Sequence, residues 1–294
     1  MTHTLEQGKS PQELLREREK RVTDAIGLRA TDRVPVSCEI GFFAAKYAGI
    51  PCSAAYYDCD AWFAAYRKTL RDFQPDMAFT RAFSPGSALE TLDPKFMRWP
   101  GHGVGPNNGL QVIEIESLQE DEYDLFLNDT PDYLIRHHLP RLNGSMEWLA
   151  GLPPLSGMSW AEPWATQNLA VFLTDPKVEA AIENLQKAGR EIRRQGPRMA
   201  EFNQLLADYG IPTLHQGGML PPFDIVSHSI RGMKGTMLDM YRRPDKLLEA
   251  CDMLLRKELA RPLPPPNEYG NLRLFMTNTR GSDDFMSAKQ FDRF

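Results

Sequence analysis

The chain has 294 residues, of which 42% are hydrophobic and 25% are charged, the balance of an ordinary globular protein. That length suits one large domain or two smaller ones. The formal net charge of −5 gives no long-range attraction to nucleic acid or acidic lipid, so we expect neither as a partner.

The four cysteines form no CxxC pair and no pair with histidine at zinc-finger spacing. Unpatterned cysteines in a large chain indicate a reducing compartment, where thiols serve as small apolar side chains. Residues 1–19 are polar and lack the apolar core of a secretory signal. The apolar stretch at 41–50 is too short to span a bilayer. We therefore expect a cytoplasmic protein without a membrane segment.

Helices and short apolar runs alternate along the chain. A capping box at Ser10–Glu13, with proline at the first helical position, predicts a helix that ends near Gly27. Apolar runs predict buried strands, and amphipathic spacing predicts longer helices. The strands are expected at 33–40, 76–83, 211–217 and 272–278, and the further helices at 60–73, 175–195, 224–241 and 244–260, with a shorter one ending at 209. This order is typical of a parallel sheet with crossover helices.

Residues 84–170 interrupt this alternation. The glycine-rich stretch at 100–109 is not a dinucleotide fingerprint, because it neither follows a convincing strand nor opens a helix. A strand at 110–115 and a helix that begins near 120–126 are expected after it. We interpret 84–170 as an insertion within a single domain of residues 1–294, and as a lid over its site.

Three segments carry a resemblance to a known family. They are DRVPV at 32–36, HQGGMLPPFDIVSHSIRG at 215–232 with the YRRPDKLLEACD that follows, and RGSDDFMSAKQFDRF at 280–294. Together they resemble the uroporphyrinogen decarboxylase superfamily, which contains porphyrinogen decarboxylases and corrinoid-linked methyltransferases. The resemblance implies an α/β fold, a TIM-type (β/α)8 barrel of which this chain supplies about the first four strand–helix units. Members of the superfamily continue past the point that matches Phe294, so the chain looks truncated at its C-terminus.

The chain departs from the true decarboxylases at the positions that bind substrate. Those enzymes carry two arginines at positions that match Ile40 and Ala44 here, an aspartate near Phe83, and a tyrosine at the position of His228. An octacarboxylate porphyrinogen needs several cationic or N–H donors to balance its charge. The resemblance therefore favours the methyltransferase branch, which transfers a methyl group between a small molecule and the corrinoid of a partner protein.

Two alternatives to methyl transfer stay open. One is decarboxylation of a porphyrinogen. The other is a truncated, non-catalytic half-barrel that pairs its open sheet edges with a second copy, as a homodimer. In the methyltransferase branch, zinc ordinarily activates a thiol and is held by one histidine and two cysteines on later strands. No metal ligand can be carried over to this chain, so zinc is expected only in a longer protein.

Three residues near predicted strand ends are candidates for catalysis. Glu39 ends the first strand and could act as an acid, a base or a ligand, or pair with an arginine. His215 lies in the third strand segment, and its alternative is a histidine satisfied by a backbone carbonyl. His228 follows Asp224 at i,i+4 spacing, so Asp224 could orient the imidazole or cap a helix.

Four further residues are candidates for substrate or cofactor binding. Arg231 and Lys234 flank Gly232 and could contact a phosphate or a carboxylate, or form surface salt bridges. Asp283 and Asp284 follow the fourth predicted strand. They could bind a metal or polarise a substrate, or cap the helix that begins near 287.

Overall fold

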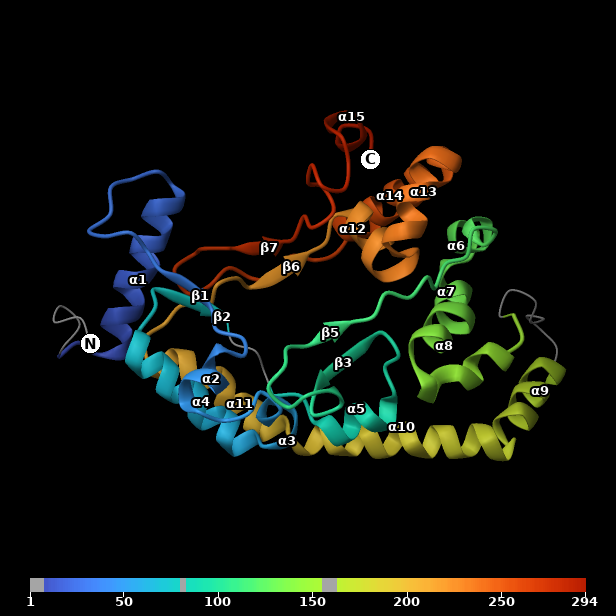
Figure 1. Cartoon of the computed structure of the whole chain (residues 1–294), viewed down its shortest axis with the longest axis horizontal. Coiled ribbons are helices and arrows are strands. Elements are labelled where there is room, and N and C mark those ends of the chain that lie inside the picture. The colour runs from blue at the N-terminus through green and yellow to red at the C-terminus, as the bar shows by residue number, and fades with distance from the viewer. Residues whose placement is uncertain (1–7, 80–82, 155–162) are drawn as a thin grey trace.

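The computed structural model describes residues 8–79, 83–154 and 163–294 (Figure 1). The chain forms a helix-rich α/β arrangement in which short strands lie beside much longer helices. The strands are β1 (Ser37–Glu39), β2 (Met77–Phe79), β3 (Met97–Pro100), β4 (Gly103–Val104), β5 (Gln111–Val112), β6 (Gly217–Met219) and β7 (Leu274–Met276).

The helices cover most of the remaining described chain. The α-helices are α1 (Pro11–Ile26), α2 (Phe43–Ala48), α3 (Ala54–Tyr57), α4 (Cys59–Phe73), α5 (Gly86–Leu92), α6 (Tyr123–Asn128), α7 (Thr130–Tyr133), α8 (Leu139–Leu142), α9 (Pro163–Leu173), α10 (Pro176–Arg194), α11 (Gly196–Asp208), α12 (Pro222–Asp224), α13 (Gly232–Arg242), α14 (Pro244–Leu259) and α15 (Ala288–Phe291). Two π-helices, η2 (Leu134–His138) and η5 (Ile225–Ile230), and the 3-10 helix η3 (Gly144–Gly151) complete the set. Within the described ranges, no helix has both the length and the apolar character needed to cross a membrane.

The parallel strand segments lie in the order in which they occur along the chain. β1 pairs with β2, and β6 pairs with β7, both in parallel. A parallel bridge from Ala78 to Thr213 joins β2 to the segment that leads into β6. The expected parallel arrangement is confirmed, although residues 80–82 of the second expected strand lie outside the described ranges. The described residues do not close into a barrel.

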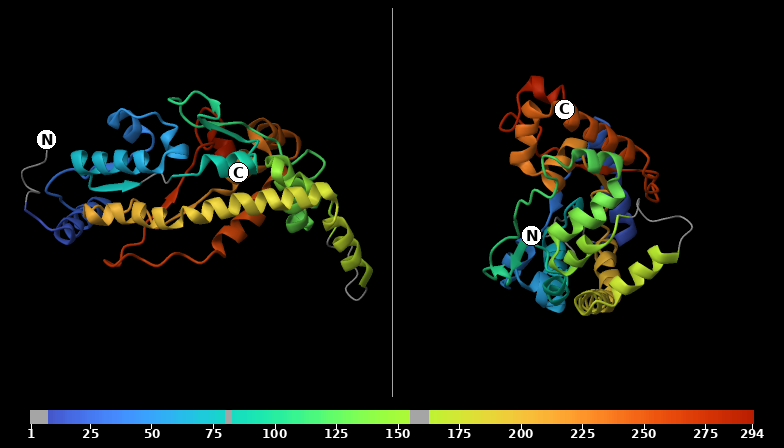
Figure 2. Two further views of the ribbon diagram at one scale, coloured as in Figure 1. Left: turned by 90° about the horizontal axis from the view of Figure 1, so that it is seen from below. Right: turned by 90° about the vertical axis from the view of Figure 1, so that its right-hand side faces the viewer.

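Local signals account for most of the helix ends. Both halves of the Ser10–Glu13 capping box are present, and the α1 helix starts with Pro11 as expected. Asp58 caps α4 and Asp175 caps α10 through side-chain bonds to backbone N–H groups. The long α10 helix runs along the lower edge of the molecule in Figure 1, and Figure 2 shows it lengthwise from below and end-on from the side.

The single helix expected at 224–241 is wrong, because η5 and a turn divide it. Gly232 has a φ of 74° and separates η5 from α13. The carbonyl of Ile230 accepts hydrogen bonds from the backbone N–H groups of Ser117 and Leu118, each at 2.8 Å. Since this carbonyl is bonded to a distant segment, the helical ladder ends here.

The region at 84–170 contains a small sheet, and its residues 155–162 lie outside the described ranges. β3 pairs with β4 and β5 in a small sheet, and α5 packs against α10. The expected strand at 110–115 is shortened to β5, and the expected helix near 120–126 is α6. Residues 114–118 lie against η5 and the start of α13. The role of this region as a lid stays a prediction.

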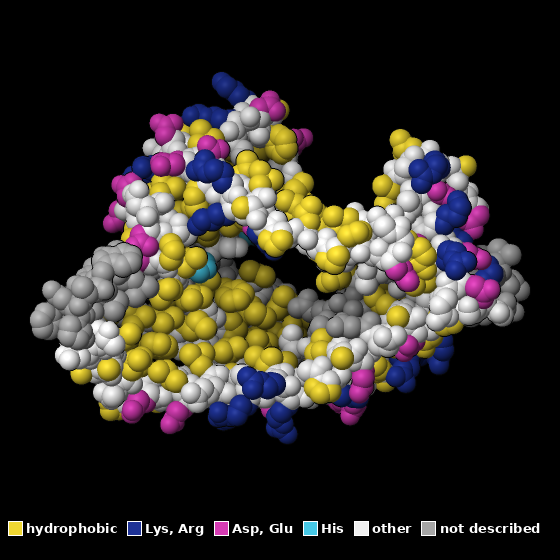
Figure 3. Space-filling model, turned by 180° about the vertical axis from the view of Figure 1, so that it is seen from behind, with side chains coloured by type: hydrophobic (Ala, Val, Ile, Leu, Met, Phe, Trp, Pro, Cys, Tyr) yellow, Lys and Arg dark blue, Asp and Glu magenta, His cyan; other side chains and the backbone are white. Residues whose placement is uncertain are grey.

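Two separate clusters of buried hydrophobic side chains stabilise the fold. The first joins α4 to α11 and includes Trp62, Tyr66 and Phe202, whose rings meet at 5.0 Å centroid distances. The second joins α6 to η5 and α14 and includes Phe126 and Val226. Figure 3 shows further hydrophobic side chains gathered across a broad hollow on the back of the molecule.

The DRVPV motif takes part in a buried ion-pair network around Asp76, a fully buried residue directly before β2. Arg21 Nη1 lies 2.5 Å from Asp76 Oδ1, and Arg33 Nη2 lies 2.8 Å from the same oxygen. The backbone N–H of Val36 donates to Asp76 Oδ2 at 2.8 Å. Arg21 also binds Asp32 and holds the pKa of that carboxyl well below its usual range. The motif therefore ties α1 to the first two parallel strands.

We expect Asp76→Ala to lower the free energy of unfolding by about 3–5 kcal/mol, because it leaves buried arginine charge uncompensated. Urea unfolding followed by circular dichroism measures this. Asp252 lies exposed on α14, and we expect Asp252→Ala to change the same quantity by less than about 0.5 kcal/mol. An equal, small effect of both substitutions would contradict the anchoring role of Asp76.

Candidate functional site

The carboxyl ends of β6 and β7 meet at one edge, because the two strands are parallel. Asp224, at the end of α12, is 2% exposed and reaches the segment that follows β7. Its carboxylate accepts hydrogen bonds from the backbone N–H of Thr279 at 2.8 Å and of Arg280 at 3.1 Å. It also accepts one from the Thr279 hydroxyl at 3.2 Å. A single carboxylate therefore joins the segments that follow the two strands.

His228 lies on η5 and reaches Asp224 only through Thr279. His228 Nε2 is hydrogen-bonded to Thr279 Oγ1. An ionised carboxylate only accepts hydrogen bonds, so the Thr279 hydroxyl donates to Asp224, and its oxygen accepts from the Nε2–H of His228. This arrangement leaves His228 Nδ1 with a free lone pair.

Neither of the two expected roles of Asp224 is present among the described contacts. Asp224 makes no direct hydrogen bond to His228, because its oxygens are occupied by the donors of Thr279 and Arg280. It holds the N-cap position of η5, but its side chain makes no capping hydrogen bond there, and Pro221 holds the N-cap position of α12.

The surroundings of His228 favour its neutral form over its protonated form. Burial lowers its pKa, the positive charge of Arg280 lowers it further, and the carboxylates of Asp224 and Glu114 act in the opposite direction. A neutral imidazole with one free nitrogen is suited to accept a proton from a bound molecule.

Arg280 presents a cation that has no carboxylate partner within the described part of the chain. Its guanidinium carbon lies 4.9 Å from the centre of the Phe285 ring. Nη1 lies 3.2 Å from Met233 Sδ, a weak acceptor, and Nε is buried without any acceptor. Thr279 and Arg280 were not predicted as site residues from the sequence, although their place directly after the fourth predicted strand could have indicated them.

His215 is held between two aromatic rings of neighbouring strands. The imidazole stacks on Phe79 of β2 at 5.1 Å and on Phe275 of β7 at 5.3 Å. Its Nδ1 is buried and has no partner among the described residues, so the backbone carbonyl expected in the alternative is absent. Phe79 and Phe275 remain 41% and 46% exposed. The three rings form an aromatic row whose surface is open to solvent.

Glu39 ends β1 as expected, directly opposite Phe79 in the strand pairing. It is exposed, and the described residues include no arginine within ion-pair distance of it. Its catalytic role stays a prediction.

Arg231 is buried and engaged in internal ion pairs. Its Nε lies 2.7 Å from Asp239 Oδ2 and its Nη1 2.9 Å from Glu116 Oε2. The Tyr123 hydroxyl donates to the same Asp239 oxygen at 2.8 Å. Arg231 therefore holds the inserted region against α13, and its contacts account for it without a ligand.

The other predicted binding residues are exposed. The side chain of Lys234 faces solvent, while its backbone N–H, with that of Met233, faces the Glu114 carboxylate. Asp283 and Asp284 are exposed and form no ion pair within the described ranges. Ser287, rather than either aspartate, caps α15.

The described residues do not fit a zinc centre. Among them, no group of three or more His, Cys, Asp or Glu side chains could hold a metal ion. Burial raises the pKa of Cys38 and of Cys52, and raises the pKa of Cys251 to about 12. These thiols are therefore protonated near neutral pH and supply no thiolate nucleophile.

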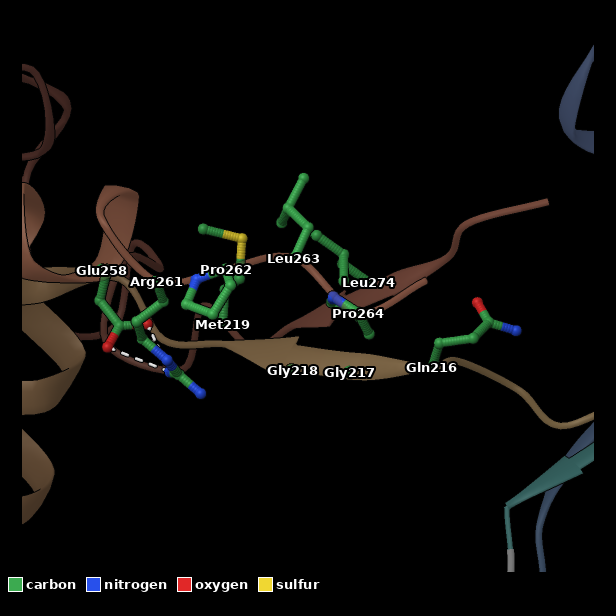
Figure 4. Close-up of a pocket in the computed structure, with 10 residues that line it drawn as sticks. All are labelled: Gln216, Gly217, Gly218, Met219, Glu258, Arg261, Pro262, Leu263, Pro264 and Leu274. Atoms are coloured by element: carbon green, nitrogen blue, oxygen red, sulfur yellow. Dashed lines mark hydrogen bonds and ion pairs between the residues drawn. The ribbon is translucent and has the colours of Figure 1, made fainter. Parts of the chain in front are cut away.

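Two other features resemble sites but have structural explanations. Ser117 Oγ lies 2.7 Å from His138 Nδ1, yet Ser117 is fully buried and its hydroxyl donates to the carbonyl of Ile230. A pocket of about 280 Å³ lies beside β6 and β7 and is bordered by residues 262–264. Figure 4 shows the side chains that line it. The charged residues that line it, Glu258 and Arg261, form an ion pair at 2.9 Å.

Comparisons of the chain with protein-family models, with curated proteins and with solved structures found no match. The resemblance drawn from the sequence motifs therefore stays a prediction. The three motifs lie in two places in the structure. The motif at 32–36 belongs to the ion-pair network around Asp76. The motifs at 215–232 and 280–294 contact each other through Asp224, at the carboxyl edge of β6 and β7.

We expect the His228 pKa to lie below 6.5 and to rise in Arg280→Gln, because the substitution removes a nearby positive charge. Titration of the imidazole signals by ¹H–¹³C NMR measures both values. Arg67, exposed on α4, provides the control, and Arg67→Gln should leave the His228 pKa unchanged. A His228 pKa at or above 6.5, unaffected by Arg280→Gln, would contradict this description of the site.

Proposed function

We propose that this chain forms consecutive strand–helix units of a TIM-type barrel and acts in methyl transfer to or from a corrinoid, as a member of the uroporphyrinogen decarboxylase superfamily. The observation that carries the proposal is the sequential order of the parallel strand segments, with Asp224, His228, Thr279 and Arg280 just after the ends of β6 and β7. In barrel enzymes, the chemistry is located at this carboxyl edge.

The aromatic row supports a flat, largely apolar ligand. Phe79, His215 and Phe275 offer ring surface from adjacent strands, and Met276 at the end of β7 is 61% exposed. Such a surface suits the face of a corrin macrocycle, because burial of apolar area is favourable and aromatic rings add stacking. When bound, a corrinoid supplies a methyl group on cobalt or accepts one.

His228 supplies the proton acceptor in this proposal. Its Nδ1 would take the proton of a thiol or hydroxyl acceptor and leave the acceptor sulfur or oxygen with the electron pair that methyl transfer requires. A bound methylcorrinoid would supply the methyl group and would keep the electron pair of the carbon–cobalt bond that breaks. Asp224 and Thr279 act as positioning residues, since they fix the tautomer that keeps Nδ1 unprotonated.

Methyl transfer is favoured over porphyrinogen decarboxylation by the environment of the first strand. Ile40 and Ala44, which stand at the positions of the substrate-binding arginines, are 2% and 0% exposed. Side chains buried in the core do not contact a substrate, so these positions supply none of the required donors.

The proposal is tested with methylcobalamin as methyl donor and 2-mercaptoethanol as acceptor, by mass spectrometry of the S-methyl product. We expect the product to form faster with the protein than without it. We expect His228→Ala to reduce the rate about 100-fold or more, because general-base catalysis contributes about 10²–10⁴-fold. His102, exposed on the inserted region, is the control, and His102→Ala should retain the rate.

No product above the protein-free reaction would contradict methyl transfer by this chain and favour the non-catalytic half-barrel. An undiminished rate in His228→Ala would contradict the role of His228 alone.

A further inference from the structure

The carboxylates near Arg280 accept hydrogen bonds from backbone N–H groups, whereas Arg280 itself has no carboxylate partner within the described part of the chain. The Asp224 carboxylate accepts hydrogen bonds from Thr279 and Arg280 backbone groups, and Glu114 accepts from the backbone N–H of Met233 at 2.8 Å. Both acidic groups therefore have fixed donors. The Arg280 guanidinium, in contrast, contacts only the Phe285 ring and the Met233 thioether within the described part of the chain.

A buried N–H group costs free energy unless it donates to an acceptor, and the planar guanidinium of arginine matches a carboxylate or another oxyanion. The guanidinium carbon lies 4.9 Å from the centre of the Phe285 ring, and the buried Nε lacks an acceptor. Asp283 and Asp284, three and four residues further along the chain, form no ion pair with it. The missing partner is thus an anion that the described residues do not provide.

We propose that Arg280 binds the carboxylate of a small organic acid, and that this acid is the methyl donor or acceptor placed beside His228. A carboxylate matches the planar donor fork of arginine, whereas the weak Met233 contact at Nη1 is readily replaced. The assignment of the acid as a substrate rests on the proposed methyl transfer. The binding of a carboxylate at Arg280 does not.

Bound carboxylate also changes the electrostatics of His228. This imidazole is influenced by Arg280, Asp224 and Glu114, and Thr279 is hydrogen-bonded to it. A carboxylate on Arg280 offsets the positive charge that depresses the His228 pKa, so binding makes His228 a stronger base.

The test uses the full chain without methylcobalamin and follows the arginine Nε–Hε signals by ¹H–¹⁵N NMR during titration with benzoate. We expect a saturable shift of the Arg280 signal, with half-saturation at about 1 mM, and a rise in the His228 pKa at saturation. Arg280→Gln should weaken the binding of benzoate at least tenfold. Arg280→Lys should weaken it several-fold, because lysine keeps the charge but loses the planar fork.

Three results would overturn the inference. One is an equal drift of every exposed arginine signal with ionic strength, for which Arg67 is the internal reference. Another is unchanged benzoate affinity in folded Arg280→Gln or Arg280→Lys. The third is tighter binding of inorganic phosphate than of benzoate, which would replace the carboxylate by a phosphate ligand. Because the readout is binding alone, it can succeed or fail independently of the methyl-transfer assay.

Discussion

The buried carboxylate of Asp224 is the interaction on which the candidate site depends. It accepts hydrogen bonds from two consecutive backbone N–H groups and one hydroxyl in the segment that follows β7. Burying a carboxylate costs free energy unless its oxygens accept hydrogen bonds. Asp224 therefore holds the segment that follows β7 close to α12. The positions of His228 and Arg280 relative to each other follow from this constraint.

Two ion-pair networks with buried members set the surroundings of the site. Asp76 links α1 and the DRVPV motif to β1 and β2 through hydrogen-bonded ion pairs. Arg231 links the inserted region to α13 through ion pairs with Glu116 and Asp239. Such pairs are sensitive to the loss of either partner, and they stabilise positions rather than perform chemistry. The sequence motifs thus have different tasks: the first anchors the sheet, and the later two meet at its carboxyl edge.

The sequence predicted those parts of the fold that depend on neighbouring residues. The capping box of α1, the helices α4, α10 and α14, and the parallel order of the strand segments all follow from local spacing and caps. The break at Gly232 did not, because it depends on hydrogen bonds from Ser117 and Leu118 to the carbonyl of Ile230, more than a hundred residues away.

The candidate site was predicted less completely than the fold. The sequence predicted that His215, His228 and Asp224 lie near strand ends, and their roles stay predictions; their partners come from other elements. Thr279 joins His228 to Asp224, and Phe79 and Phe275 stack on His215. Arg231 looked like a ligand-binding cation, and only its buried partners in the inserted region show its anchoring contacts. The sequence gives no indication of which cation lacks a partner, since this depends on three-dimensional contacts.

The most direct test of the account is amide hydrogen exchange of the whole chain with and without methylcobalamin, measured by mass spectrometry. If the carboxyl edge of β6 and β7 is the binding site, protection will increase in peptides that cover 215–231 and 274–286. Helix α10, on the far side of the small inserted sheet, will exchange as before. Protection confined to α10 and α5, or no change at 215–231 and 274–286, would contradict the placement of the site at this edge.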